Sequence, residues 1–207
     1  MNITRLTNQY IREHPSVADC LALGLINYSA LAREICESLK IPAFDAVLVA
    51  CRRYRAKHAD RSAHERRVMT LIKHAKVRVK NKIAVAIIDK VKVFEDTLSL
   101  QRHVRKDRGD FNLIEGEEVI TVITNVDYLS DIHDTFGSKV KKVTKDLVQI
   151  SMVFDPRLET TSGVVSHVYR LFAENSINIR EEMSCWTDII IVIDEKDIGR
   201  AMHVLSL

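Results

Sequence analysis

The chain has 207 residues, which is enough for one or two domains with a substantial core. Hydrophobic residues make up 46% and charged residues 29%, as in an ordinary globular protein, and no apolar run approaches the roughly 20 residues of a membrane helix. The first residues lack the apolar segment of a signal peptide, so we expect a cytoplasmic protein.

The net charge of +3 conceals two parts of opposite sign. Residues 1–80 hold 15 Lys and Arg against 7 Asp and Glu, whereas residues 81–207 hold 16 against 21. Such a split indicates two modules with different partners. The basic residues of the first module gather in one stretch: Arg52, Arg53, Arg55, Lys57, Arg61, Arg66, Arg67, Lys73, Lys76, Arg78 and Lys80.

Residues 1–76 show the apolar periodicity of short helices and predict a compact helical bundle. The expected helices cover residues 2–13, 16–25, 28–39, 44–57 and 62–74. The third and fourth, joined by the turn Lys40–Ala43, resemble a helix-turn-helix.

The basic excess beside this pair of helices would favour DNA phosphates. The residues predicted to contact nucleic acid are Arg52, Arg53, Arg55, Arg66 and Arg67. However, the start of the second helix, Pro42–Ala50, is almost entirely apolar and is poorly suited to reading bases. The other interpretation is a packing or dimerisation module whose Arg and Lys side chains are solvated.

From residue 77 the pattern changes to β-branched residues that alternate with polar or small ones, which predicts strands. A strand from Val77 to Val91 is followed by a helix over 97–105, strands over 111–114 and 119–123, a helix from Asp127 that Gly137 closes, and a strand over 140–143. The expected order over residues 77–146 is β-α-β-β-α-β.

The same order begins again at Leu147, more clearly. A strand over 148–154, a helix over 164–172, strands over 177–183 and 188–194 and a helix over 198–205 are expected. No fourth strand follows, so we predict an internal duplication whose second copy lacks its last strand. An open sheet edge would result, and we expect two chains to pair there as a homodimer.

Four segments of the second copy keep the order and spacing of an ACT domain, which the chain resembles. They are Ile150–Phe154, Thr160–Val165, Leu171–Ile179 and Thr187–Ile193. The resemblance is to the regulatory kind found at the end of aspartate kinases, and residues 83–146 resemble a degenerate partner copy. It implies an α+β fold, with a helical bundle over 1–76 followed by tandem ferredoxin-like domains over 77–146 and 147–207.

The resemblance also implies a ligand site at the first strand-to-helix turn, facing the start of the next strand. Carried over, the ligand-binding residues are Asp155, Thr161, Ser162, Gly163, Val164, Val165, Asn178 and Ile179. A helix N-terminus suits a carboxylate, and the amide of Asn178 can both donate and accept. We expect Thr160, Thr161 or Ser162 to cap the helix, and both turns to lie side by side.

No catalytic constellation, metal-ligand spacing or cofactor motif stands out. The cysteines Cys20, Cys36, Cys51 and Cys185 are separated, and residues 1–80 contain no phosphate-binding glycine motif, so kinase activity is not carried over. We therefore predict a non-catalytic regulatory protein that senses an amino acid and signals to DNA or a protein partner. The alternative is a ligand-free subunit that binds a metabolic enzyme through ACT pairing.

Overall fold

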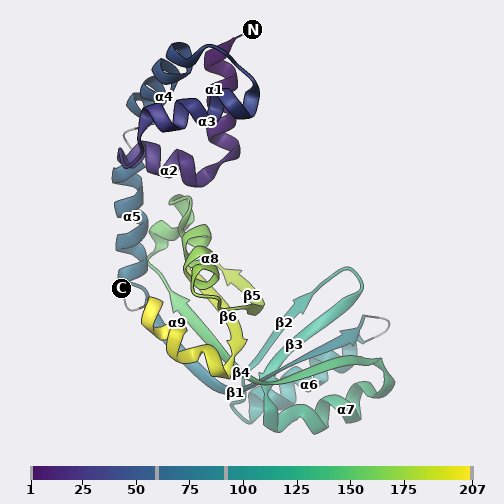
Figure 1. Ribbon diagram of the computed structural model, residues 1–207. Coiled ribbons are helices and arrows are strands. Elements are labelled where there is room, and N and C mark those ends of the chain that lie inside the picture. Colours follow the sequence, from purple (N-terminus) through teal and green to yellow (C-terminus); the bar gives the residue numbers. More distant parts are fainter. Residues whose placement is uncertain (1, 59–60, 91–92, 206–207) are drawn as a thin grey trace. The chain divides into compact units, whose positions relative to one another are not determined.

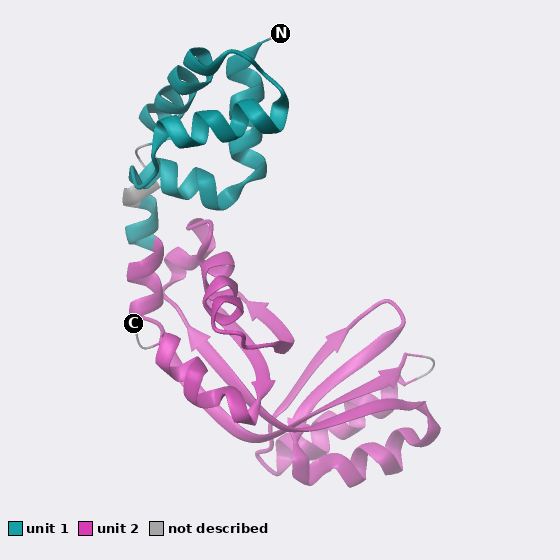
Figure 2. Ribbon diagram, in the orientation of Figure 1, with its two compact units in different colours: residues 1–67 teal, residues 68–207 magenta. Residues whose placement is uncertain are grey.

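The computed structural model describes residues 2–58, 61–90 and 93–205. The chain forms two compact units, residues 1–67 and residues 68–207, here called unit 1 and unit 2 (Figure 2). Among the described residues, no helix combines the length and the apolar character needed to cross a bilayer.

Unit 1 is helical, as predicted. Its helices are α1 (Ile3–Glu13), α2 (Pro15–Leu23), α3 (Tyr28–Leu39) and α4 (Phe44–His58), followed by α5 (Arg61–Lys73), which continues into unit 2. Local chemistry sets these boundaries. The side chain of Asn27 accepts hydrogen bonds from the amides of Ser29 and Ala30 and so caps α3, while Gly24, at φ 74°, ends α2.

The core of unit 1 lies between α1, α2, α3 and α4. Its buried side chains include Ile11, Leu21, Ile35, Val47 and Cys51. Burial, followed by the nearby thiol of Cys36, raises the pKa of Cys51 to about 11, so this thiol stays protonated and acts as a small hydrophobe.

The C-terminal ends of α1 and α4 are built alike, each by a tyrosine and the histidine four residues later. The ring centroids are 4.1 Å apart in both Tyr10–His14 and Tyr54–His58. In each pair, Nδ1 of the histidine lies 2.8 Å from the backbone carbonyl oxygen of the tyrosine. This contact and the stacking hold each imidazole against the last turn of its helix.

Unit 2 is built on one antiparallel six-stranded sheet with the order β2-β3-β1-β4-β6-β5 (Figure 1). The strands are β1 (Lys76–Asp89), β2 (Phe111–Glu115), β3 (Val119–Asn125), β4 (Val140–Val153), β5 (Ile179–Cys185) and β6 (Asp188–Asp194). The helices are α6 (Phe94–Lys106), α7 (Leu129–Phe136), α8 (Val164–Glu174) and α9 (Ile198–Leu205). Val91, which the sequence places with the first strand, lies outside the described residues.

The sheet serves two lobes, each with its own hydrophobic core. In the first lobe α6 and α7 pack on β1 and β3, around Val104, Ile132 and Phe136. In the second lobe α5, α8 and α9 pack on β4 and β6, around Ile150 and Phe172. The first lobe is a complete β-α-β-β-α-β unit with the sheet order β2-β3-β1-β4, which is the ferredoxin-like arrangement.

The second lobe has a fourth strand, contrary to the prediction of an open edge. The start of β1, Lys76–Lys80, pairs antiparallel with Gln149–Val153 of β4. It therefore fills the position that a strand after α9 would otherwise take. The prediction was wrong because the sequence presents Lys76–Asp89 as one uninterrupted strand and does not reveal that its two ends serve different lobes. The edges of the sheet are β2 and β5.

A β-bulge in β1 separates the part that serves the second lobe from the part that serves the first. Lys80 pairs with Gln149 and Ile83 with Leu147, so β1 has one residue more than β4 in this interval. Lys82, within the bulge, has a left-handed φ of 55°.

A second bulge follows at once, in β4. Ile83 pairs with Leu147 and Val85 with Thr144, so the extra residue now lies in β4, where Asp146 has φ 57°. Each bulge shifts the alternation of its strand by one residue. Beside the two bulges, β1 then faces the helices with the odd-numbered Val77 in the second lobe and the even-numbered Ala84 and Ala86 in the first. β4 does so with the even-numbered Val148 and Ile150 in the second lobe and the odd-numbered Val143 in the first.

The face of the sheet that carries no helix is also partly buried. A small cluster there draws on all six strands. Its buried residues are Ile83, Val85, Ile123, Leu147 and Val192, and Ile114 and Met183 pack against them. These side chains alternate along the strands with those of the two helix-covered cores. The cluster therefore contains residues from both lobes.

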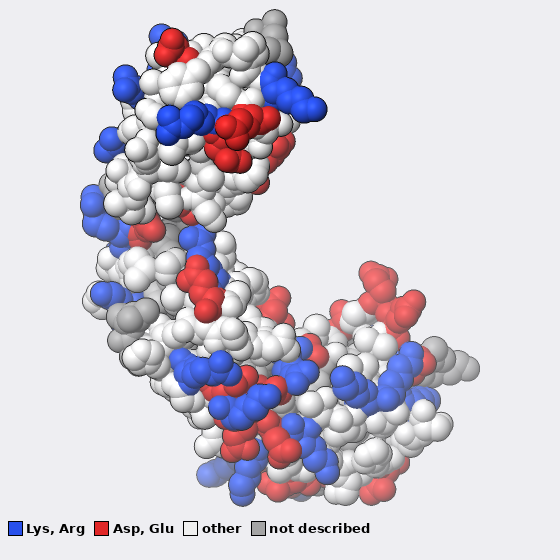
Figure 3. Space-filling view, in the orientation of Figure 1, with Lys and Arg blue, Asp and Glu red and all other residues white. Residues whose placement is uncertain are grey.

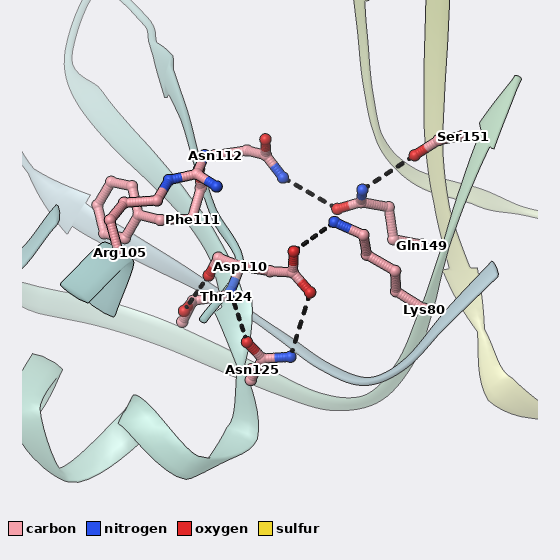
Figure 4. A network of polar contacts seen from close by, with 9 residues as sticks. All are labelled: Lys80, Arg105, Asp110, Phe111, Asn112, Thr124, Asn125, Gln149 and Ser151. Carbon is pink, nitrogen blue, oxygen red and sulfur yellow. Dashed lines mark hydrogen bonds and ion pairs between the residues drawn. The ribbon is translucent and has the colours of Figure 1, made fainter. Parts of the chain in front are cut away.

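A polar network lies on the same face (Figure 4). Nδ2 of Asn112 on β2 donates to Oε1 of Gln149 on β4 at 3.0 Å, and Nε2 of Gln149 donates to Oγ of Ser151 at 3.1 Å. In a flat sheet, β2 and β4 would be three strand spacings, about 14 Å, apart. A direct bond between them requires a strongly curved sheet.

The other part of the network fixes the approach to β2. Lys80 and Asp110 form an ion pair, the amide of Asp110 donates to Oδ1 of Asn125 at 2.7 Å, and Oγ1 of Thr124 donates to the carbonyl of Asp110 at 2.6 Å. Lys80 belongs to the part of β1 that serves the second lobe, so this ion pair also links the lobes (Figure 4).

The bulge in β1 gives a test of the shared strand. Replacing Lys82 by Gly should leave the free energy of unfolding unchanged or raise it by less than about 1 kcal/mol, because glycine adopts positive φ without a steric cost. Replacing Lys82 by Val should lower it by about 1–2 kcal/mol, since a β-branched residue resists this conformation. Urea unfolding measures both. Equal effects of Gly and Val would show that the position is not held in the left-handed region.

The network gives a second test. Gln149 is only 2% exposed, so Gln149→Leu should cost about 1–3 kcal/mol by leaving the amide of Asn112 without its acceptor. Asn112→Ala should add little once Gln149 is replaced, because the same bond is already lost. A double-mutant cycle in urea measures the coupling. Strictly additive losses would contradict a direct bond between β2 and β4.

Candidate ligand-binding site

The turn that follows β4 contains most of the predicted ligand residues. Asp155 caps the short 3₁₀ helix η3 (Pro156–Thr160) by accepting the amide of Arg157 at 2.9 Å, and it also accepts Nε of Arg157 at 2.8 Å. These hydrogen bonds hold the pKa of Asp155 below its ordinary value. The carboxylate is therefore already engaged with Arg157, and Thr161 ends η3.

The residues after Thr161 lead into α8. Gly163 takes the N-cap position of the helix with φ 88°, a conformation that favours glycine, and has no side chain with which to cap it. The N-cap position, expected at Thr160, Thr161 or Ser162, falls on Gly163 instead. Val164 is buried in the core of the second lobe, whereas Val165 is exposed. Only the backbone of Val164 remains available to a ligand.

The other predicted residues, Asn178 and Ile179, lie at the opposite end of the sheet. Val153 and Cys185 both pair with Asp188, so the end of β4 and the end of β5 lie together. Ile179 pairs with Ile193 at the other end of β6. The seven residues of β5 span roughly 20 Å at about 3.3 Å per residue. Within one chain the two turns are therefore not side by side, because β4 and β5 run in the same direction.

The hairpin turn between β5 and β6 lies beside the Asp155 turn instead. The amide of Phe154 donates to the carbonyl of Thr187 at 2.9 Å. Trp186, next to Thr187, is 69% exposed and has φ 51°, which is an outlier for a bulky residue. Trp186 lies between the strands predicted over 177–183 and 188–194, and nothing in the sequence indicated that it lies next to the candidate site. It is the only tryptophan of the chain.

At the end of the sheet near Asn178, a charged hollow of about 450 Å³ is lined by residues of the β4 bulge and by Arg180 and Asp194. Nε and Nη2 of Arg180 donate to the two carboxylate oxygens of Asp194 at 2.8 and 2.9 Å. These bonds, and the charges of Arg180 and Lys196, hold the pKa of Asp194 below its ordinary value. The pair fixes the start of β5 against the end of β6.

This pair predicts a pH dependence. Because the pKa of Asp194 is lower in the folded protein, the stabilisation is complete above about pH 4, the ordinary carboxyl range, and is lost as the pH falls through the folded pKa. Asp194→Asn should therefore lower the melting temperature at pH 7, and its difference from the wild type should shrink below about pH 4. Glu195→Gln, an exposed neighbour, is the control. A difference independent of pH would contradict the assignment.

The first lobe contains a cavity at its own strand-to-helix turn. It measures about 140 Å³, is largely apolar, and lies between α6 and β2, with Val93, Leu98, Leu113 and Ile120 among its walls. At its rim, Nζ of Lys90 lies 2.8 Å from Oε1 of Glu115. A small apolar group would fit there beside a pair of opposite charges, which the sequence did not indicate.

The residues predicted to contact nucleic acid are divided among different surfaces. Arg52 and Arg55 line a hollow beside Tyr28, whose hydroxyl accepts Nη1 of Arg55 at 3.1 Å, whereas Arg53 faces α1. Arg66 and Arg67 lie on α5. On the face drawn in Figure 3, positive and negative side chains are interspersed over unit 2. Binding of nucleic acid by these five arginines stays a prediction.

In the described part of the chain, no three His, Cys, Asp or Glu side chains come together as metal ligands. All four cysteines are free, and Cys20 and Cys185 are exposed.

No protein-family model and no curated protein matches the sequence. Solved structures do match. The α and β subunits of an aspartokinase match with a TM-score of 0.52 and 16% identity, over 66% of this chain and 94% of that one. The regulatory subunit of aspartate kinase from Thermus thermophilus matches with a TM-score of 0.51 and 12% identity, over 65% and 95%.

Aspartate kinase from Clostridium acetobutylicum matches with a TM-score of 0.51 and 12% identity, over 63% of this chain. The matched region spans only 33% of that enzyme's chain. Together with the sheet order of unit 2, these likenesses show that about two thirds of the chain has the ACT-type fold of aspartate kinase regulatory regions. The resemblance stated from the sequence is confirmed at the level of the fold.

Proposed function

We propose that this chain is a non-catalytic regulatory protein whose ACT-type unit 2 senses a small ligand, an amino acid. The observation that carries the proposal is the ACT-type fold of unit 2. Proteins of this fold among the matches include a regulatory subunit of aspartate kinase. The start of α8 at Gly163 supports it, because the amides and the dipole of a helix N-terminus favour a carboxylate.

We further propose that the second-lobe site is completed by a second copy of the chain. β5 is a sheet edge, and two β5 strands pairing antiparallel would place Asn178 of one copy at the end where the other copy has its Asp155 turn. This homodimer replaces the one expected at the missing strand. Trp186 lies at the same end and would contact such a site.

The first test is thermal melting of the full chain against each of the twenty amino acids. A ligand that binds only the folded state stabilises it by about 2.7 kcal/mol at a concentration one hundred times its dissociation constant. One amino acid, or a group of related ones, should raise the melting temperature and shift the emission of Trp186. If none does, the alternative function, a ligand-free assembly subunit acting through its sheet edges, is favoured.

The second test uses calorimetry with that amino acid. Asn178→Ala should weaken binding by about 1–3 kcal/mol by removing a polar anchor, and Gly163→Val should block approach to the helix start. His203→Ala, an exposed change on α9, is the control. If both site variants bind like the wild type, the ligand lies elsewhere, and the first-lobe cavity is then the next position to test.

Mixing the two variants tests the shared site. A heterodimer of Gly163→Val and Asn178→Ala chains keeps one intact site, because the unchanged turn of one chain faces the unchanged Asn178 of the other. Refolding the mixture together should therefore restore binding to a minority of sites. A site formed within one chain would gain nothing from mixing. Light scattering that finds only monomers would also exclude the shared site.

Regulation of transcription, with unit 1 binding DNA, remains a prediction. The first turn of α4 exposes Asp45 and Ala46, an acidic and a small apolar residue, where a recognition helix would present its base-reading side chains. The Arg and Lys residues of α4 lie in its C-terminal half. Any contact with DNA there would be to phosphates.

A further inference from the structure

A hollow of about 360 Å³ lies between α1 and α4 in unit 1. Thr4, Asn8 and Arg12 line it from α1, four residues apart and therefore on one face of that helix. Arg53 and Lys57 line it from α4 with the same spacing. Two neighbouring helices thus direct three cationic side chains to one concave surface.

No acidic residue lines this hollow in the described part of the chain. Like charges four residues apart on a helix, such as Arg53 and Lys57, are unfavourable by a few tenths of a kcal/mol, and Arg12 adds a third positive charge from across the groove. A multiply charged anion would relieve this repulsion.

Asn8, which lines the hollow, has a side-chain oxygen without a partner among the described residues. Oδ1 of Asn8 is shielded from solvent and accepts no hydrogen bond from them. A buried acceptor without a donor is costly, so a ligand hydroxyl that reached it through a shift of the Asn8 side chain would gain a hydrogen bond. Nε of Arg12 donates to the carbonyl of Asn8 at 3.2 Å, which ties the guanidinium to the same position on α1.

The aromatic pair at the end of α4 makes one wall rigid. Tyr54 is 6% exposed, and the ring of His58 stacks on it with an interplanar angle of 17°. Nδ1 of His58 lies 2.8 Å from the carbonyl oxygen of Tyr54, so the ring is also held by a hydrogen bond. Both residues line the hollow. Because their side chains are already held in place, a ligand that binds there loses less conformational entropy in fixing them.

We propose that this hollow binds a phosphate group, carried by a phosphorylated small molecule or by a nucleic-acid backbone. Phosphate fits better than a carboxylate, because three cations exceed the single charge of a carboxylate and the guanidinium fork matches phosphate oxygens in pairs. Arg12 is the distinguishing residue, since it lies far in the sequence from the basic run that begins at Arg52. The site belongs to unit 1 and is independent of amino-acid sensing by unit 2.

The experiment uses the full chain at low salt with two probes, pyrophosphate followed by calorimetry and a fluorescein-labelled DNA duplex followed by anisotropy. Arg12→Ala and Arg53→Ala should each weaken binding at least about 10-fold, the effect of one charge-assisted hydrogen bond. Arg33→Ala, on the exposed face of α3, removes the same charge outside the hollow and should change affinity less than about twofold. Melting temperatures check that each variant is folded.

The two probes distinguish the sources of phosphate. If DNA binds, and each Arg→Ala change makes the dependence on salt shallower by about one unit of slope, the ligand is a nucleic-acid backbone. If pyrophosphate binds and DNA does not, the ligand is a small phosphorylated molecule. The proposal is overturned if neither probe binds at low salt, or if Arg33→Ala weakens binding as much as Arg53→Ala does.

Discussion

The pairing of β1 with β4 holds unit 2 together. These two strands have 14 residues each. They pair from Lys76 and Val153 at one end to Ile88 and Val140 at the other. Every other strand and helix of unit 2 belongs to the lobe at one end of this ribbon or at the other. The paired bulges at Lys82 and Asp146 are the necessary correction, because an uninterrupted alternation would turn the apolar face away from the helices in one of the lobes.

The sequence predicted the elements well and their long-range pairing poorly. The helices of unit 1 and the strand and helix order of unit 2 follow from local apolar periodicity, which is set by residues close in the chain. β4 was predicted as two strands, 140–143 and 148–154, because the bulge at Asp146 breaks the alternation between them. The pairing of Lys76–Lys80 with β4 joins segments about seventy residues apart, and no local pattern records it.

The candidate site shows the same division. That a turn would lead from β4 into a helix at Val164, with Gly163 before it, could be read from residue types. That Asn178 lies at the far end of β5 could not, because it depends on strand direction in the folded sheet. Trp186 and Arg12 were missed for a related reason. Each lies next to its proposed site through a contact between elements, and nothing in its sequence neighbourhood marks it.

The interleaved strands also allow the first lobe to fold before the second during synthesis. Residues 83–143 contain nearly all of the first lobe, so that lobe can close before the second lobe has been made. Once the first lobe has folded, it holds Lys80 and Gln149 close together although they are far apart in the chain. Most of the entropic cost of closing the loop between these two residues has then already been met. The second lobe then completes its sheet by extending an existing ribbon. The first lobe can thus act as the template on which the second lobe is assembled.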